Sequence, residues 1–135
     1  MSGVDIADLL RRALQCRGCS KEQVGNFDGH STIELELQNL PNLNVEQVDE
    51  DVWFWSSVEE CNSAQLRHCA ADLLQWLMPV CPYARTGQLQ LAQVNDRLEL
   101  RVMLSSETLD SEESLAEALD SFLESLQALQ GILCQ

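Results

Sequence analysis

The C-terminal part of the chain carries a long, narrow apolar stripe, and this stripe limits the possible folds more than any other feature. Large apolar side chains recur between residues 115 and 133 in alternating steps of four and three, which places them on one side of a single helix. They are Leu115, Leu119, Phe122, Leu126, Leu129 and Leu133. Asp110, with Glu113 three residues later, is predicted to cap this helix. Such stripes occur in coiled-coil seams and in helices that lie on a sheet, and strand patterns elsewhere in the chain favour a helix on a sheet.

Strand patterns occupy much of the remaining chain. Apolar and polar residues alternate over residues 32–38, which predicts a half-buried strand, and a second short strand is expected at 43–45. Alternation also flanks the dipeptide Asn95-Asp96, whose residues tolerate the positive φ of a two-residue turn. This pattern predicts a hairpin within residues 88–104.

A third strand, expected over residues 52–58, is apolar on both faces. Val52 and Phe54 point to one face, and Trp53 and Trp55 point to the other. One of these faces must meet the core. The other is either covered by a helix or forms an exposed aromatic surface of the kind that binds proteins, and the two interpretations carry equal weight.

Two further helices are predicted outside these strands. The first covers residues 6–14, with Ser2 as its cap and Gly18 as its stop signal. The second begins near Asn62 and must end before Pro79, because the residue that precedes a proline avoids helical geometry.

The predicted elements follow the order helix, three strands, helix, two strands, helix. Short turns join most of the strands, so the sheet should be mainly antiparallel and the fold α+β. The chain has 135 residues, which is the size of one domain, and residues 1–135 are expected to form a single domain.

The helix predicted over residues 62–78 is apolar around most of its circumference. Its apolar arc covers roughly 220°, whereas one core contact needs about 100°. Such a helix is buried from two directions, and the second cover is either its own domain or, as we favour, a second subunit. The predicted homodimer interface consists of Leu66, Ala70, Leu73, Trp76 and Leu77.

The charge balance excludes several classes of partner. Eight Lys and Arg residues stand against 22 Asp and Glu residues, a formal net charge of −14. Nucleic acids and anionic membranes are both bound through basic clusters, and the sequence has none. A field of this sign keeps a protein soluble and suits a basic or neutral partner.

Targeting signals are not expected either. The first ten residues lack the basic n-region of a signal peptide, and no apolar run is long enough to span or insert into a membrane. We therefore predict a cytoplasmic protein whose six cysteines are reduced thiols.

Cys16 and Cys19 form a CxxC pair, which is typical of redox dithiols and of half a zinc site. The pair follows a helix, where the helix dipole opposes a thiolate, and no second compact ligand pair exists at a familiar spacing. We therefore predict structural thiols and no metal site. No catalytic residue can be assigned from the sequence, because neither a phosphate-binding loop nor a convincing triad is present.

Several short motifs occur together along the chain. They are His30-Ser31-Thr32, Leu40-Pro41, Asp51-Val52-Trp53 with Trp55, and Ala84-Arg85 with Gly87-Gln88-Leu89. In this combination the chain resembles the type III secretion chaperones, and among them the InvB/SpaK invasion-type group that serves several effectors. The resemblance covers essentially the whole chain.

The resemblance implies a small, acidic, cytosolic homodimer with the chaperone fold, without enzymatic activity and without a cofactor. Each dimer would hold the N-terminal chaperone-binding segment of a secreted effector in extended form, through strand addition and apolar grooves, and keep it stable and competent for secretion. The resemblance places these contacts on the first helix and the first three strands. The predicted client-contacting residues are Ile6, Leu10, Leu14, Ile33, Leu35, Trp53, Phe54 and Trp55.

Two other functions stay open at this point. One is a thiol-redox or zinc-binding module built on Cys16 and Cys19, which metal analysis and thiol titration would reveal. The other is a dimeric regulator that sequesters a protein, whose partner would stay bound as a folded domain.

Overall fold

The protein was analysed as a computed structural model, which describes residues 5–18, 32–60 and 62–134. The described elements confirm the predicted α+β order. They are helix α1 (Ile6–Cys16), strands β1 (Ile33–Leu35), β2 (Leu43–Val48) and β3 (Asp51–Glu60), helix α3 (Ser63–Leu77), strands β4 (Gln90–Val94) and β5 (Arg97–Met103), a short 3₁₀ helix η1 (Glu107–Leu109) and helix α4 (Glu112–Leu133).

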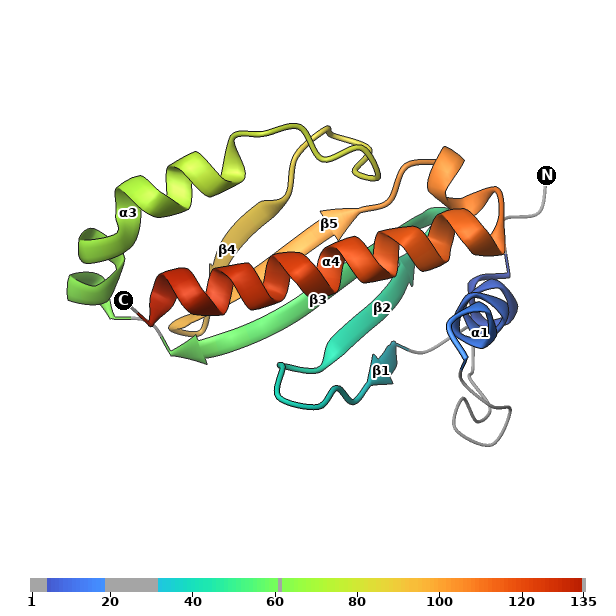
Figure 1. The fold of residues 1–135 in the computed structure, drawn as a ribbon, viewed down its shortest axis with the longest axis horizontal. Coiled ribbons are helices and arrows are strands. Elements are labelled where there is room, and N and C mark those ends of the chain that lie inside the picture. The colour runs from blue at the N-terminus through green and yellow to red at the C-terminus, as the bar shows by residue number, and fades with distance from the viewer. Residues whose placement is uncertain (1–4, 19–31, 61, 135) are drawn as a thin grey trace.

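The five strands form one antiparallel sheet in the order β1-β2-β3-β5-β4 (Figure 1). The hairpin turn between β4 and β5 lies where the sequence predicted it. Asn95 and Asp96 have φ values of 52° and 66°, which join β4 to β5, and Asp49 has a φ of 57° in the turn between β2 and β3. Asn and Asp tolerate this left-handed region better than other residues with a side chain, so these turns fix the register of both hairpins.

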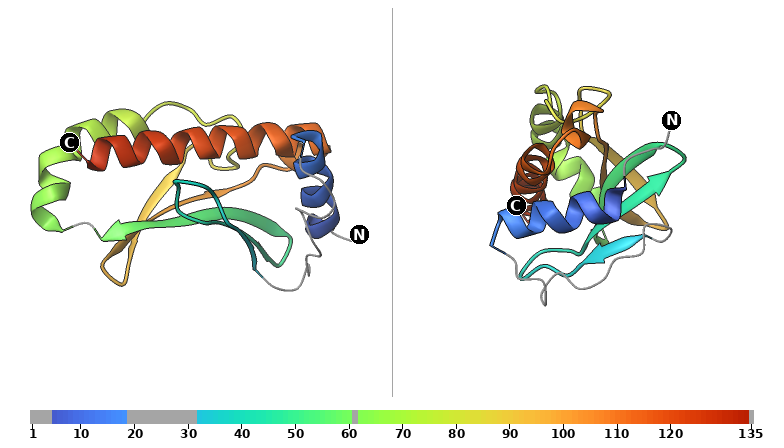
Figure 2. Two further views of the ribbon diagram at one scale, coloured as in Figure 1. Left: turned by 60° about the horizontal axis from the view of Figure 1, so that its bottom comes forward. Right: turned by 90° about the vertical axis from the view of Figure 1, so that its right-hand side faces the viewer.

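Helix α4 lies along one face of the sheet, and no described helix covers the opposite face (Figure 2). All six residues of its predicted stripe are buried, and the ring centroid of Phe122 lies 5.7 Å from that of Phe54 on β3 in an edge-to-face arrangement. The stripe therefore packs on the sheet and is not a coiled-coil seam. We call the face under α4 the inner face and the opposite one the outer face.

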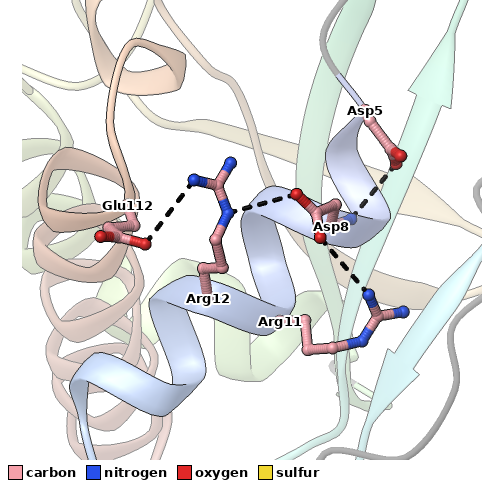
Figure 3. A network of polar contacts seen from close by, with 5 residues as sticks. All are labelled: Asp5, Asp8, Arg11, Arg12 and Glu112. Atoms are coloured by element: carbon pink, nitrogen blue, oxygen red, sulfur yellow. Dashed lines mark hydrogen bonds and ion pairs between the residues drawn. The ribbon is translucent and has the colours of Figure 1, made fainter.

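The two other helices stand at opposite ends of the sheet (Figures 1 and 2). Helix α1 packs near the N-terminal end of α4, with Leu10 and Ala13 fully buried. Around this contact, Arg12 bridges Asp8 on its own helix at 3.2 Å and Glu112 on α4 at 3.8 Å (Figure 3). These half-exposed ion pairs stabilise little, so apolar burial holds α1 in place.

Helix α3 is attached to the far end of α4. The Gln65 side-chain amide donates a 2.6 Å hydrogen bond to the carbonyl of Leu133, in the last turn of α4. Asn62 caps α3 as predicted, since its carboxamide oxygen accepts from the Gln65 amide at 2.8 Å. The Asn62 cap and the hydrogen bond from Gln65 to Leu133 together fix the first turn of α3.

The residues that cap α1 and α4 differ from the predicted ones. Ser2 lies outside the described residues, and Asp5 caps α1 by accepting from the backbone amide of Asp8. The prediction of Asp110 as the cap of α4 is wrong, because Asp110 closes the 3₁₀ turn and has helical dihedral angles. Ser111 is the first extended residue, and its hydroxyl accepts from the Ser114 amide at 3.1 Å.

The loop between α3 and β4 folds back against the end of the sheet. The Cys81 amide donates to the carbonyl of Gly87, whose φ of +85° favours glycine. The Arg85 amide donates to the carbonyl of Met103 at 2.8 Å, and its guanidinium contacts the carboxylate of Asp51 at 2.6 Å. The loop thus joins the β2–β3 turn to the end of β5.

Ser56 is the one polar residue in the buried series of β3. Its hydroxyl is fully buried beneath α4 and has no hydrogen-bond partner among the described residues. Ser56→Ala should therefore raise the free energy of unfolding by about 1 kcal/mol, because it removes an unpaired polar group at nearly constant volume. Urea denaturation followed by circular dichroism measures this change, and a loss of stability would show that the hydroxyl is satisfied in solution.

Candidate interaction surfaces

The outer face of the sheet presents two tryptophans at its centre. Residues directly opposite one another on neighbouring strands share a face. One such row joins Glu46, Trp53 and Met103, and a second joins Trp55 to Arg101. The alternate residues of β3, including Phe54, are buried on the inner face. The prediction that Trp53 and Trp55 share one face and Phe54 takes the other agrees with this register.

Polar neighbours hold both indole rings in place. The guanidinium of Arg101 stacks over the Trp53 ring, 4.8 Å from its centroid, and lies 3.4 Å from the carboxylate of Glu99. The indole N–H of Trp55 donates to the carboxylate of Glu46 at 3.1 Å. Because these contacts orient the rings while leaving them half-buried, the outer face is a preformed aromatic surface.

The structure divides the predicted client-contacting residues into two groups. Four of them belong to the core, where α1 and the inner face of the sheet enclose them: Ile6, Leu10, Ile33 and Phe54. A client cannot contact these four side chains directly, because they pack against other residues of the protein's own core. The other four are half-buried: Leu14, Leu35, Trp53 and Trp55. Leu35 lies opposite Leu43 on the inner side, so only the tryptophans share the outer face.

Helix α3 uses only part of its apolar arc within the protein. Leu73 is just 6% exposed and packs in the core of its own chain, and Leu66 and Trp76 pack beside it. Leu74 and Met78 are 60% and 64% exposed. The exposed apolar surface is therefore rotated away from the predicted stripe. We call Leu74, Met78 and the following Val80, which is 78% exposed, the α3 patch.

The remaining predicted interface residues behave differently from Leu73. Leu77 is half-buried, and Ala70 is exposed. Sequence reasoning missed Val80, because it follows Pro79 and lies outside any helical pattern. It also missed Arg101 and Met103, which the alternation of β5 placed on a polar face.

A cavity of about 640 Å³ lies beside the α3 patch, between the α3–β4 loop and α4. Its lining includes Trp76, Val80 and Tyr83 on one side and Glu117 and Glu124 on the other. Burial raises the pKa of the Tyr83 phenol above its ordinary value, so this group stays protonated and uncharged. The cavity thus combines an apolar floor with an acidic rim.

The cysteines do not form a site in the part of the chain that the structure describes. Cys16 is exposed at the end of α1, and its predicted partner Cys19 lies outside the described residues. Within the described ranges, no group of three or more metal-ligating side chains converges. No described helix is long and apolar enough to cross a membrane.

Exposure and burial predict distinct thiol reactivities. Cys16 and Cys134 are exposed, whereas Cys69 and Cys81 are buried, and burial raises the pKa of the Cys81 thiol. Since the thiolate is the reactive form, iodoacetamide at neutral pH should modify the two exposed cysteines at least about tenfold faster than the two buried ones. Peptide mass spectrometry over a time course measures the four rates. Equal rates in the folded protein would contradict the described packing.

Comparison with known proteins agrees with the sequence motifs. Residues 18–95 match the model of the invasion protein B family. The Surface presentation of antigens protein SpaK of Salmonella typhimurium (strain LT2) and that of Salmonella typhi are each 35% identical over 133 residues, covering 98% of this chain and 98% of each relative.

A solved structure has a similar fold at low sequence identity. It is a chain in the heterodimeric complex ExoU–SpcU from the type III secretion system of Pseudomonas aeruginosa, with a TM-score of 0.58, 19% identity, and coverage of 95% of this chain and 93% of that one. The family and the fold are those of type III secretion chaperones and not of an enzyme family. The resemblance read from the motifs is thus confirmed, and the chain belongs to the invasion protein B family.

Proposed function

We propose that this chaperone-type protein acts in the bacterial cytoplasm on type III secretion effectors. It binds the N-terminal chaperone-binding segment of each effector in extended form and keeps the effector stable and competent for secretion. The single domain of residues 1–135 works as a homodimer, without a cofactor. The observation that carries this proposal is the preformed aromatic surface around Trp53 and Trp55, on a sheet face that no described helix covers.

The outer face suits an extended client for physical reasons. Aromatic rings held in fixed orientations bind apolar side chains with little loss of side-chain entropy. Among the described strands, β1 and β4 are the outermost of the sheet, and a client strand added beside either of them would gain main-chain hydrogen bonds that depend little on its sequence. A similar fold in a heterodimeric type III secretion complex supports a protein partner.

Among the predicted client contacts, Trp53 and Trp55 are the direct anchors of this proposal. Leu14 and Leu35 are accessible at the side of α1 and β1 and would extend the contact. The four buried members of the predicted set support these residues from behind. The net charge of −14 keeps a protein with such apolar surfaces soluble while no client is bound.

The homodimer is proposed to form through α3. The α3 patch leaves large apolar side chains in water, and a second copy would cover them symmetrically. Leu77 and Ala70 border this patch, and Leu66, Leu73 and Trp76 hold the helix against its own chain.

Co-purification tests the proposed function. The tagged protein is expressed in a bacterium that carries a type III secretion system, and bound proteins are identified by mass spectrometry. Hydrogen exchange of the recovered complex should show that the chaperone protects only an N-terminal segment of the client. Within that segment, the amides should not show the protection pattern of a folded domain. A client that stays bound as a folded domain would instead support the sequestering regulator.

A substitution in the CxxC pair tests the thiol alternative. Cys16→Ser with Cys19→Ser should leave client affinity unchanged and cost at most a few kcal/mol of unfolding free energy, because free cysteines pack as small apolar residues. Isothermal titration of the client segment and urea unfolding measure the two quantities. Loss of binding in a folded variant, or stoichiometric zinc in the native protein, would favour the thiol or zinc function.

A further inference from the structure

The cavity beside the α3 patch carries charge of only one sign. Three carboxylates line it, from Glu107 on η1 and from Glu117 and Glu124 on α4, and none of its described lining residues is Lys, Arg or His. Neither Glu117 nor Glu124 has an ion-pair partner among the described residues. Asp120 on the same helix, by contrast, pairs with Arg17 at 2.7 Å. The cavity therefore offers carboxylates to a cation that its own chain does not place there.

The exposed side of α3 carries one line of residues that ends beside this cavity. Arg67, Ala71, Leu74 and Met78 lie within about 60° of one another around the helix, and all four are exposed. Arg67 is the only Lys or Arg of α3, and its guanidinium has no carboxylate partner among the described residues. Val80, the last member of the α3 patch, also lines the cavity. A chain that covers the patch thus reaches the edge of the cavity.

Side-chain size along this line favours one way of pairing two copies. The N-terminal part of the exposed side has the small Ala70 and Ala71, and the C-terminal part has the large Leu74 and Met78. In an antiparallel pair with a two-fold axis at Leu74, each Met78 packs over the small alanines of the other copy. A parallel pair would set Met78 against Met78 and leave a gap between the alanines. The antiparallel pair therefore fills the interface better.

This pairing brings Arg67 of each copy to the acidic cavity of the other. Arg67 precedes Leu74 by seven residues, so in the antiparallel pair it lies beside the other chain about 10 Å beyond Leu74. At that point α3 has ended, and the chain forms a wall of the cavity at Val80. We propose that in the homodimer the guanidinium of each Arg67 enters the cavity of the other copy and pairs with the carboxylates of Glu117 and Glu124.

This inference rests on the proposed homodimer and names its register and the charged contact that completes it. Two chains with a net charge of −14 repel one another, so apolar contact forms against an electrostatic cost. An arginine that enters an acidic cavity adds attraction where the chains meet, and two-fold symmetry makes the contact twice. Water is partly excluded from a cavity, which strengthens each contact relative to an ion pair on an open surface.

Charge exchange between the two sides of the contact tests this proposal. Arg67→Glu sets carboxylates against carboxylates at both contacts of a dimer, and Glu117→Arg with Glu124→Arg sets guanidinium groups against each other. Each variant alone should dimerise at least about tenfold more weakly than the unaltered protein, because attraction at two sites becomes repulsion. Sedimentation velocity over a concentration series measures the dissociation constants, and circular dichroism confirms that each variant is folded.

A mixture of the two variants gives a readout that a general loss of stability cannot imitate. In their heterodimer each contact again joins a guanidinium to carboxylates, so the mixture should associate within about threefold of the affinity of the unaltered protein. If arginines in the cavity unfold the chain, Glu117→Gln with Glu124→Gln replaces that variant. Its mixture with Arg67→Glu should associate more tightly than Arg67→Glu alone.

Arg97→Glu is the matched control, because it makes the same change of charge at an exposed position of β5 outside the α3 patch and the cavity. It should leave the dissociation constant within about threefold of the original value. It should also fail to restore association when it is mixed with the Glu117→Arg and Glu124→Arg variant.

The remaining outcomes contradict either the contact alone or the homodimer as well. An unchanged dissociation constant in Arg67→Glu, or folded variants that mixing does not rescue, overturns the Arg67 contact and leaves the homodimer intact. Equal weakening by Arg97→Glu assigns the effect to net charge and overturns the contact too. A monomeric mass for the unaltered protein overturns the homodimer together with this inference, whereas client binding is tested separately by co-purification.

Discussion

Phe54→Ala is expected to lower the free energy of unfolding by about 3–5 kcal/mol, while Trp53→Ala and Trp55→Ala should each cost less than about 2 kcal/mol. Phe54 is fully buried against Phe122, so its truncation leaves a cavity under α4. The tryptophans lie on the outer face and are half-buried. They should instead lose client affinity by about 30-fold each, as aromatic anchors do. Urea unfolding and client titration on all three variants measure both quantities.

Val94→Ala is the control for this comparison, because Val94 is an exposed apolar residue at the sheet edge. It should change stability little. If all three truncations unfold the protein, or if none of them changes client affinity, β3 is purely core and the outer face is not the client surface.

Leu74→Asp with Met78→Asp should convert the proposed homodimer into a folded monomer. Both side chains are more than half exposed in the single chain, so charge is tolerated there without loss of the fold. In an interface covered by a second copy, two buried carboxylates would weaken association by at least about 100-fold. Multi-angle light scattering at micromolar concentration measures the mass, and circular dichroism confirms the fold.

Charge placed elsewhere provides the control for the dimer experiment. Gln127→Asp with Gln93→Asp adds the same charge at exposed positions outside the α3 patch and should leave the dimer intact. Charge at Leu73, by contrast, should unfold the chain itself, because Leu73 is buried within it. A monomeric mass for the unaltered protein would refute the homodimer.

The elements with strong local signals were predictable from sequence. The stripe from Leu115 to Leu133 has one period throughout, so it defined both the helix and its buried side. Asn95 and Asp96 fixed a hairpin because few residues with side chains accept their backbone geometry. Each of these patterns is made by residues that are only a few positions apart in the sequence, so it can be recognised without knowledge of the tertiary structure.

The predictions that were wrong or incomplete concern features that depend on contacts between segments distant in the sequence. The wide apolar arc of α3 did not reveal which half would pack on the protein, where Leu73 is buried while Leu74 is 60% exposed. The cap of α4 moved to Ser111 because a 3₁₀ turn precedes it, and hydrogen bonds from the Ser105 amide and the Thr108 hydroxyl to the Tyr83 carbonyl hold that turn. In the same way, only the register of β3 with β5 brings Arg101 onto Trp53.

The motifs quoted from the sequence were individually short, and the structure shows why two of them belong together. Asp51 and Arg85 form a 2.6 Å ion pair, and the Leu104 amide donates to the carbonyl of Val52. Motifs that are separate in sequence thus meet at one end of the sheet. Nothing in their spacing could have indicated this contact.

The three tryptophans supply the protein with its own optical reporters. Trp53 and Trp55 lie on the outer face, and Trp76 lines the cavity beside the α3 patch. Indole emission shifts when water leaves the ring, so occupation of the sheet and pairing of two chains should give separable signals. In a protein with Trp76→Phe, the emission maximum would report only the occupation of the outer face. In a protein with Trp53→Phe and Trp55→Phe, it would report only the pairing of two chains through α3.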